Sequence, residues 1–286
     1  TDLVNDGWTD LVGKMVRMYI EAMESGSQDL EALLELANLE KMDEIRARAQ
    51  ELVQDPATAE ALKPYYRMFC KRPCFHDEYL QTFNRDNVTL VDTGGAGVER
   101  ITETGVVVNG VEYQVDCIIY GTGFEVGTSY TRRCGYEIIG RGGETLSGKW
   151  EKGLRTLHGY TSRGFPNCFI MSQAQGGFTI NYPHLLDELA VHIAHIVRYA
   201  LGEGLTRLEA SAAAEEAWVQ TILDKGARGG IIGDPDCTPG YYNNEGKPNP
   251  LFDQSRPYGE GSIPYFNILK EWRDAGNFDG LEMRAG

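Results

Sequence analysis

An apolar run that ends in a glycine-rich turn is the feature that most constrains how this chain folds. The run covers residues 116–120, begins at Asp116, and leads into the turn Gly121-Thr122-Gly123-Phe124. A short apolar run bounded by glycine predicts a buried strand. Gly121 and Gly123 permit a close approach of the backbone to a ligand. The segment therefore predicts a buried strand that carries a turn to a cofactor, although a turn without any ligand has the same pattern.

Further short segments predict strands from about residue 87 onward. Residues 88–91 and 168–171 are short and apolar, and the second segment is apolar enough for the centre of a sheet. Residues 106–108 and 111–113 flank Asn109-Gly110, which is a strong signal for a hairpin with a type I′ turn. These strands predict the sheet part of an α/β fold.

Helices are predicted near both ends of the chain. Residues 8 to about 62 repeat apolar residues at helical spacing, with a break at Gly26 and an end at Asp55-Pro56. Pro183 is expected to open a helix that runs to about Leu201. The sequence also predicts helices over residues 209–225 and around 265–272, and a long surface loop over the Gly-, Pro- and Asn-rich residues 229–263.

Charge and composition exclude several classes of partner. The net charge of −15 argues against nucleic acid. No apolar stretch approaches the roughly 20 residues of a membrane helix, so no membrane partner is expected. The six cysteines are scattered, and Cys70 and Cys74 lack a second pair, so no metal site is predicted. His192 and His195 likewise lack a third ligand. The cysteines favour reduced, mostly buried thiols and a cytoplasmic protein.

Two cations precede a proline in the segment Lys71-Arg72-Pro73. An arginine is always charged and offers planar, forked donors. A fixed cation of this kind can stabilise an oxygen anion during a reaction. Taken alone, Lys71-Arg72 is more often a solvated basic pair than a functional one. The functional interpretation therefore depends on the other segments of the chain.

Residues 173–183 link a predicted strand to a predicted helix and include Asn181 and Tyr182. The backbone N–H groups at the start of that helix make a site for partial negative charge. A helix cap and turn without a ligand fits the same residues equally well.

Together and in this order, the segments 69–73, 79–88, 121–124 and 173–183 resemble the C-terminal half of class B flavoprotein monooxygenases, most closely the Baeyer–Villiger type. The resemblance runs from about residue 8 to the end. It implies an α/β fold, part of a two-dinucleotide-binding-domain, Rossmann-like flavoprotein with a helical insertion at its N-terminal end. Residues 1–85 are then the C-terminal part of an NADP-binding domain. Residues 86–286 are the C-terminal part of an FAD-binding domain, with a mobile loop at about 229–263.

The same resemblance implies roles for individual residues. Arg72 matches the arginine that stabilises the negatively charged C4a-peroxyflavin, and Lys71 matches the lysine that contacts the 2′-phosphate of NADPH. Gly123 lies in a turn near the bound dinucleotides, and Asn181 and Tyr182 match positions that face the flavin. Some members of the family carry a tryptophan, which helps to hold the nucleotide, where this chain has a cysteine at position 237.

The implied function is the oxygenation of a ketone to an ester or lactone, with FAD, NADPH and O2. Oxygenation at nitrogen or sulfur is the alternative within the same family. The family's two Gly-x-Gly-x-x-Gly loops are absent from this sequence. The remaining N-terminal half of the same enzyme is therefore an expected partner, and a non-catalytic fragment or interaction module is the alternative from another class.

Overall fold

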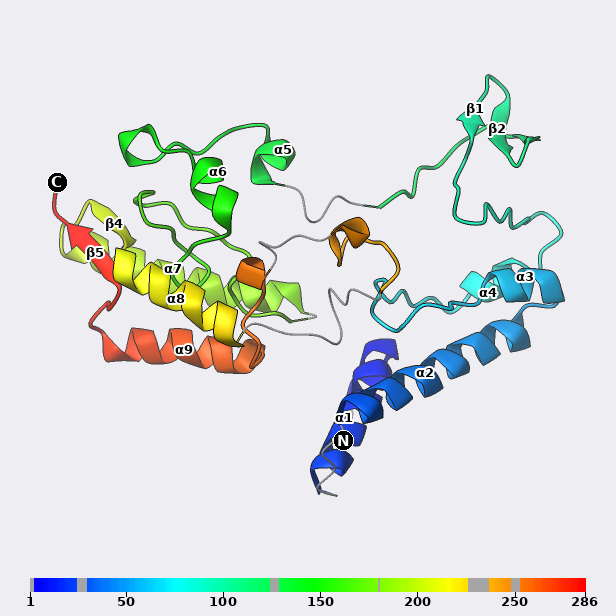
Figure 1. Cartoon of the computed structure of the whole chain (residues 1–286), viewed down its shortest axis with the longest axis horizontal. Helices are drawn as coiled ribbons and strands as arrows, with labels where there is room; N and C mark the ends of the chain where they lie inside the picture. Colours follow the sequence, from blue (N-terminus) through cyan, green and yellow to red (C-terminus); the bar gives the residue numbers. More distant parts are fainter. Residues whose placement is uncertain (1–2, 25–29, 124–128, 180, 226–236, 248–252) are drawn as a thin grey trace. The chain divides into compact units, whose positions relative to one another are not determined.

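The computed structural model describes residues 3–24, 30–123, 129–179, 181–225, 237–247 and 253–286 (Figure 1). The chain divides into two compact units. Unit 1 comprises residues 1–126 and 231–246, and unit 2 comprises residues 127–230 and 247–286. The boundary near residue 85, which the resemblance predicts for the complete enzyme, stays a prediction.

Unit 1 begins with a pair of packed helices (Figure 1). Its helices are α1 (Gly7–Glu24), α2 (Leu30–Leu52), α3 (Pro56–Ala61) and α4 (Tyr79–Thr82), with a 3-10 turn η3 (Asn244–Gly246). Lys41 bridges the first two helices through an ion pair with Asp10 at 2.5 Å. Asp55 caps α3 by accepting from the backbone N–H of Thr58, so the helix end predicted at Asp55-Pro56 is confirmed. The predicted break at Gly26 lies outside the described residues.

The sheet of unit 1 is an antiparallel meander of β1 (Arg100–Ile101), β2 (Gly105–Val108) and β3 (Val111–Gln114). Val108 pairs with Val111 across the turn. Asn109 and Gly110 have φ values of 50° and 75°. Positive φ at both central residues is what a type I′ turn requires, so the predicted hairpin is confirmed.

Two strands predicted in unit 1 are wrong. Residues 116–120 and 88–91 have no strand structure. Ile119 is 91% exposed and Tyr120 is 69% exposed, which contradicts the buried strand expected there. No described strand pairs with either segment. An apolar sequence forms a strand only where neighbouring strands satisfy its backbone N–H and C=O groups.

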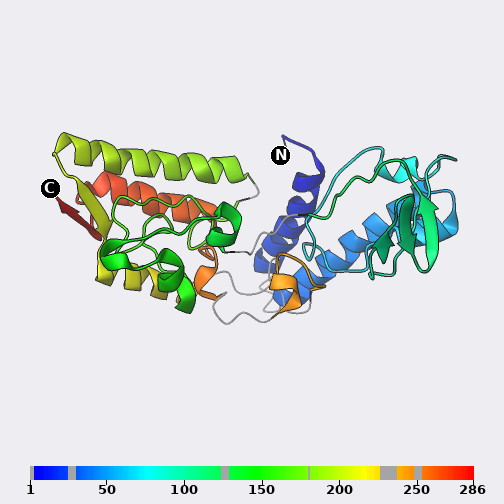
Figure 2. The same ribbon diagram turned by 90° about the horizontal axis from the view of Figure 1, so that it is seen from above.

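The described part of unit 2 has three longer helices, a two-stranded sheet and several short turns. Figure 2 shows α7 and α9 running side by side, as their contacts require. Its elements are α5 (Tyr130–Cys134), η1 (Arg141–Gly143), α6 (Leu146–Lys149), η2 (Trp150–Lys152), α7 (Tyr182–Gly202), β4 (Arg207–Ala210), α8 (Ala212–Lys225), η4 (Asp253–Ser255), α9 (Ser262–Ala275) and β5 (Leu281–Arg284). The three predicted helices of this part are confirmed, although α8 starts three residues later because β4 takes up residues 207–210.

The core of unit 2 lies between its helices. Leu189 and Ile196 from α7 pack with Leu269 from α9 in one buried cluster. His192, on the same face of α7, is also fully buried. The strand predicted at residues 168–171 is wrong, because only Phe169 makes an isolated bridge, to Thr161.

The cysteines depart from the sequence prediction of reduced, mostly buried thiols. Cys70 and Cys237 form a disulfide within unit 1, across a sequence separation of 167 residues. Cys74, Cys117 and Cys134 are exposed. Disulfides are uncommon in the cytosol, so this bond argues against the expected cytoplasmic location. The location stays a prediction.

Among the described residues, no helix is both long and apolar enough to cross a membrane. Within the same residues, no group of three or more His, Cys, Asp or Glu side chains is placed to hold a metal ion.

Candidate functional site

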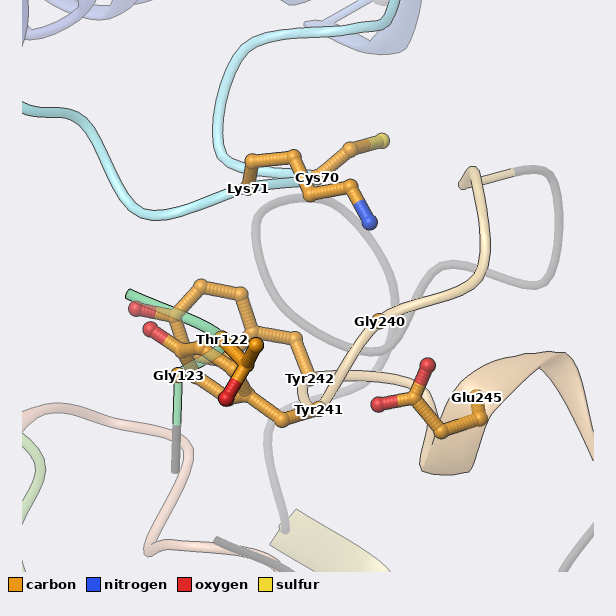
Figure 3. Close-up of a pocket in the computed structure, with 8 residues that line it drawn as sticks. All are labelled: Cys70, Lys71, Thr122, Gly123, Gly240, Tyr241, Tyr242 and Glu245. Carbon is orange, nitrogen blue, oxygen red and sulfur yellow. The ribbon is translucent and has the colours of Figure 1, made fainter. Parts of the chain in front are cut away.

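A pocket of about 180 Å³ lies in unit 1, and three segments far apart in the sequence build it (Figure 3). Lys71 comes from the segment before Pro73, Gly123 from the glycine-rich turn, and Tyr242 from the loop that follows Cys237. Its lining is Cys70, Lys71, Thr122, Gly123, Gly240, Tyr241, Tyr242 and Glu245. The structure thus brings together Lys71 and Gly123, two of the residues that the sequence predicts for cofactor binding.

Lys71 points its ammonium group towards the loop backbone at Gly240 (Figure 3). It donates a hydrogen bond to the carbonyl of Pro239. A Cβ added at Gly240 would lie 3.0 Å from the lysine nitrogen, so a glycine leaves room for the lysine. An ammonium group has three donors, so Lys71 can hold the loop and still bind an anion.

Gly123 provides the open side of the pocket. Its φ is +89°, a conformation that other residues adopt at a cost. Among the described residues other than its chain neighbours, no atom lies within 4 Å of the position that a Cβ would take. A ligand can therefore approach the backbone here, as the glycine-rich turn predicts.

Arg72 lies beside this pocket, next to Tyr241. The guanidinium lies close enough to the Tyr241 phenol to interact with it electrostatically. Burial and the neighbouring Tyr242 raise the pKa of Tyr241 to about 12, against the opposing effect of Arg72. Tyr241 therefore stays a neutral phenol at physiological pH. No negative charge on the phenol offsets the positive charge of Arg72.

The loop that carries the tyrosines is held by Asn243 and by the disulfide. The Asn243 side-chain oxygen accepts from the backbone N–H groups of Gly240 at 3.0 Å and Gly246 at 3.1 Å. Its amide nitrogen donates to the carbonyl of Cys237 at 3.0 Å. The bond between Cys237 and Cys70 then ties the start of this loop to the residue that precedes Lys71. Residues 229–236 and 248–252 of the predicted mobile loop lie outside the described residues, and α9 begins within its predicted end, at Ser262.

Asn181 and Tyr182 belong to unit 2, at the start of α7. The Asn181 side chain accepts a hydrogen bond from the backbone N–H of His184 at 3.4 Å. Tyr182 is 41% exposed. Asn181 therefore acts as a helix cap, which is the structural alternative that the sequence leaves open, and both residues remain accessible to a ligand.

Gln175 fixes the loop that leads to Asn181. It is fully buried, and its side chain accepts from the backbone N–H of Thr156 at 3.0 Å and donates to the carbonyls of Leu154 and Gln254. The indole of Trp218 donates to its carbonyl. A side chain with all its donors and acceptors in use makes this part of the loop a rigid support.

Sequence reasoning missed Tyr241, Tyr242 and the disulfide as parts of the site. The tyrosines fall in a segment that resembles the family's closing loop, but nothing in the sequence shows which of its side chains face Lys71. Cys70 immediately precedes that lysine, yet a pairing across 167 residues cannot be deduced from cysteine positions.

The residues present fit a phosphate group of a nucleotide. A lysine and an exposed arginine are adjacent, which suits phosphate oxygens. Gly123 offers open backbone, and two aromatic rings line the same pocket. The arrangement can bind an anionic ligand and place a fixed positive charge near it.

Comparisons with known proteins identify relatives over nearly the whole chain. No protein-family model matches it. The pentalenolactone D synthase of Streptomyces arenae is 51% identical over 99% of this chain and 49% of its own length. A Baeyer–Villiger monooxygenase of Stachybotrys chlorohalonatus is 44% identical over 99% of this chain and 45% of its own length. The chain spans about half the length of the curated relatives it matches.

Solved structures give the same result. A polycyclic ketone monooxygenase from Thermothelomyces thermophila matches with a TM-score of 0.79 and 33% identity, over 99% of this chain and 43% of that one. An oxidised steroid monooxygenase bound to NADP matches with a TM-score of 0.73 and 27% identity, over 88% of this chain and 46% of that one. The predicted fold class is therefore confirmed as part of the fold of these enzymes.

The comparisons also bear on the cofactors. An FAD-binding monooxygenase of Hypomyces subiculosus is 39% identical over 99% of this chain and 47% of its own length. With the NADP-bound structure, it supports the prediction of FAD and NADPH as the cofactors.

Proposed function

We propose that this chain is part of a Baeyer–Villiger monooxygenase, which oxygenates a ketone to an ester or lactone with FAD, NADPH and O2. FAD, when reduced by NADPH, supplies the activated oxygen. The protein's own residues bind the nucleotides, orient them and stabilise charge. The two glycine-rich loops and the rest of the substrate pocket belong, in this proposal, to the remaining half of the same enzyme.

The observation that carries the proposal is the pocket that joins Lys71, Gly123 and the tyrosine loop in unit 1. In this proposal Lys71 binds the 2′-phosphate of NADPH. The same ammonium group also donates a hydrogen bond to the carbonyl of Pro239. Phosphate binding is therefore coupled to the position of the loop that contains Pro239. Gly123 lets the backbone lie against the dinucleotide.

Arg72 acts as the fixed cation beside the reacting oxygen. A guanidinium at this position would stabilise negative charge that develops on oxygen during the oxygenation. Tyr241 supports this role, since as a neutral phenol it lies near Arg72 without neutralising its charge.

At the start of α7, Asn181 and Tyr182 are proposed to face the flavin. The helix N-terminus carries partial positive charge, which suits the negative charge of a reduced flavin ring. Asn181 contributes by fixing where the helix begins, and Tyr182 is exposed for contact.

The exposed apolar residues 118–120 fit the expected association with the remaining half. Ile119 and Tyr120 are too exposed to contribute to the core of unit 1. We propose that the other half covers this segment in the complete enzyme. We also propose that the enzyme lies in the cytoplasm and that neither nucleic acid nor a membrane is its partner.

Product analysis of the complete enzyme tests the function. Purified protein supplied with NADPH and O2 is given a cyclic ketone and, separately, a sulfide. Lactone as the main product supports the proposal. Sulfoxide without lactone would support the alternative of oxygenation at sulfur or nitrogen. Colourless protein that consumes no NADPH would identify a non-catalytic protein and contradict the proposal.

A further inference from the structure

The side chain of Arg72 lies against two aromatic residues from different segments of unit 1. Its guanidinium carbon is 5.6 Å from the ring centroid of Trp8, a distance at which the face of an indole attracts a cation. The Tyr241 phenol lies close enough to the same guanidinium to interact with it electrostatically. An exposed arginine otherwise samples many rotamers, so these two contacts restrict where its charge lies.

The position of Trp8 is fixed at the first turn of α1. Asp6 Oδ1 accepts from the backbone N–H of Thr9 at 2.8 Å, and Thr9 Oγ1 accepts from the backbone N–H of Asp6 at 3.0 Å. These reciprocal bonds define the start of the helix. The indole packs edge-on against Phe75, with ring centroids 5.3 Å apart. A Cβ at Gly7 would lie 2.3 Å from the Phe75 ring, so this packing requires glycine at that position.

The helix pair carries both partners of this contact. Lys41 of α2 holds α1 through Asp10 at 2.5 Å. Asn38 of α2 accepts from the backbone N–H of Met68 at 2.7 Å, four residues before the arginine. The segments that carry the indole ring and the guanidinium are therefore both held by α2. The distance between the two groups thus depends on the packing of the helical pair α1–α2.

From these contacts we propose that Trp8 is a positioning residue that holds the guanidinium of Arg72 where it stabilises the reacting oxygen. The helical pair α1–α2 thereby helps to position the charge that the reaction needs. Its catalytic consequence rests on the proposed function, whereas the physical contact does not. Trp8 touches no reacting atom itself, so its removal should weaken the step that needs the positive charge and leave nucleotide binding intact.

The contact is tested first without any turnover. Phenylglyoxal modifies free guanidinium groups, and peptide mass spectrometry measures its rate at Arg72 in the complete enzyme. Trp8→Leu keeps an apolar side chain but removes the ring face, so Arg72 should be modified roughly two- to thirtyfold faster. Trp8→Phe keeps a ring face and should stay near the original rate.

The catalytic consequence is tested by coupling, which is the ester formed per NADPH consumed. Trp8→Leu should lower the kcat for ester roughly two- to thirtyfold, while KM for NADPH is unchanged and hydrogen peroxide release rises. Trp8→Phe should restore most of the coupling. Tyr65→Leu is the matched control, because Tyr65 lies under Arg46 at 5.4 Å in the same unit, outside the pocket.

The outcomes separate this inference from the proposed function. If the unaltered enzyme forms no ester, the proposed function fails, and the modification rate still decides whether Trp8 holds Arg72. If the unaltered enzyme forms ester and Trp8→Leu changes neither coupling nor the modification rate, the positioning role is wrong. Equal losses of coupling in Trp8→Leu, Trp8→Phe and Tyr65→Leu would also overturn it, because they would indicate general destabilisation.

Discussion

Lys71 donates a hydrogen bond to the carbonyl of Pro239, so the cation predicted to read the nucleotide also holds the loop that lines its pocket. The two functions share one ammonium group. A change at this residue should therefore affect nucleotide choice and loop position together.

Replacing Lys71 with alanine should weaken NADPH binding much more than NADH binding. A charge-assisted contact contributes roughly 1.5–3 kcal/mol, which corresponds to about ten- to a hundredfold in affinity. The dissociation constants of both nucleotides measure this in the complete enzyme. Lys63→Ala is a suitable control because Lys63 pairs with Glu60 on the surface. Equal losses for both nucleotides would show that Lys71 does not read the 2′-phosphate.

Replacing Arg72 with alanine should abolish ester formation while reduction of the flavin by NADPH continues, because hydride transfer does not need the cation beside the oxygen. Arg72→Lys keeps the charge but loses the planar fork, so poor rescue is expected. Stopped-flow absorbance and product analysis separate the two half-reactions. Arg46→Ala serves as the control, because Arg46 also lies over an aromatic ring, that of Tyr65. Ester formation at the original rate in Arg72→Ala would contradict the catalytic assignment.

Reducing the disulfide should destabilise unit 1. The bond between Cys70 and Cys237 closes a long loop, and in the chain-entropy model such a bond contributes about 2–5 kcal/mol to the free energy of unfolding. Thermal unfolding with and without dithiothreitol should show a lower Tm under reduction. The double variant Cys70→Ser, Cys237→Ser should match the reduced protein, and Cys117→Ser, which removes an exposed thiol, should not. An unchanged Tm would mean that the bond does not stabilise the fold.

Unit 2 should lose stability in acid because two of its histidines are buried. Burial lowers the pKa of His158 from 6.5 to about 4 and, with nearby positive groups, that of His192 to about 3. Both stay neutral when folded and bind protons when unfolded. Their contribution is complete above pH 6.5 and is lost as pH falls towards the folded values, by about 1.4 kcal/mol per pH unit for each residue.

Urea unfolding over this pH range checks the prediction. His192→Gln should flatten the dependence. His184→Gln is the control on the same helix and should leave it unchanged, because the His184 side chain is only partly buried, with 42% of its surface exposed. The same slope in His192→Gln as in the unaltered protein would rule out His192 as a source of the acid sensitivity.

Local signals in the sequence predicted their structures, and signals that depend on distant partners did not. Asn109-Gly110 determines its own turn, and Asp55-Pro56 determines a helix boundary, because both act through neighbouring backbone groups. Residues 116–120 are apolar and strand-like, but a strand depends on partners that the sequence does not reveal. For the same reason the sequence predicted Lys71 and Gly123 individually, but did not predict that Tyr241 and Tyr242 complete their pocket.

The disulfide also changes how the polypeptide is connected. Because Cys70 is bonded to Cys237, the chain between them forms a covalent ring that includes Arg72, the glycine-rich turn and the start of α7. A single proteolytic cut inside that ring leaves the two pieces covalently joined until a reductant is added, whereas a cut outside it releases a fragment at once. Gels run with and without reductant would thus report whether a nick lies within the ring.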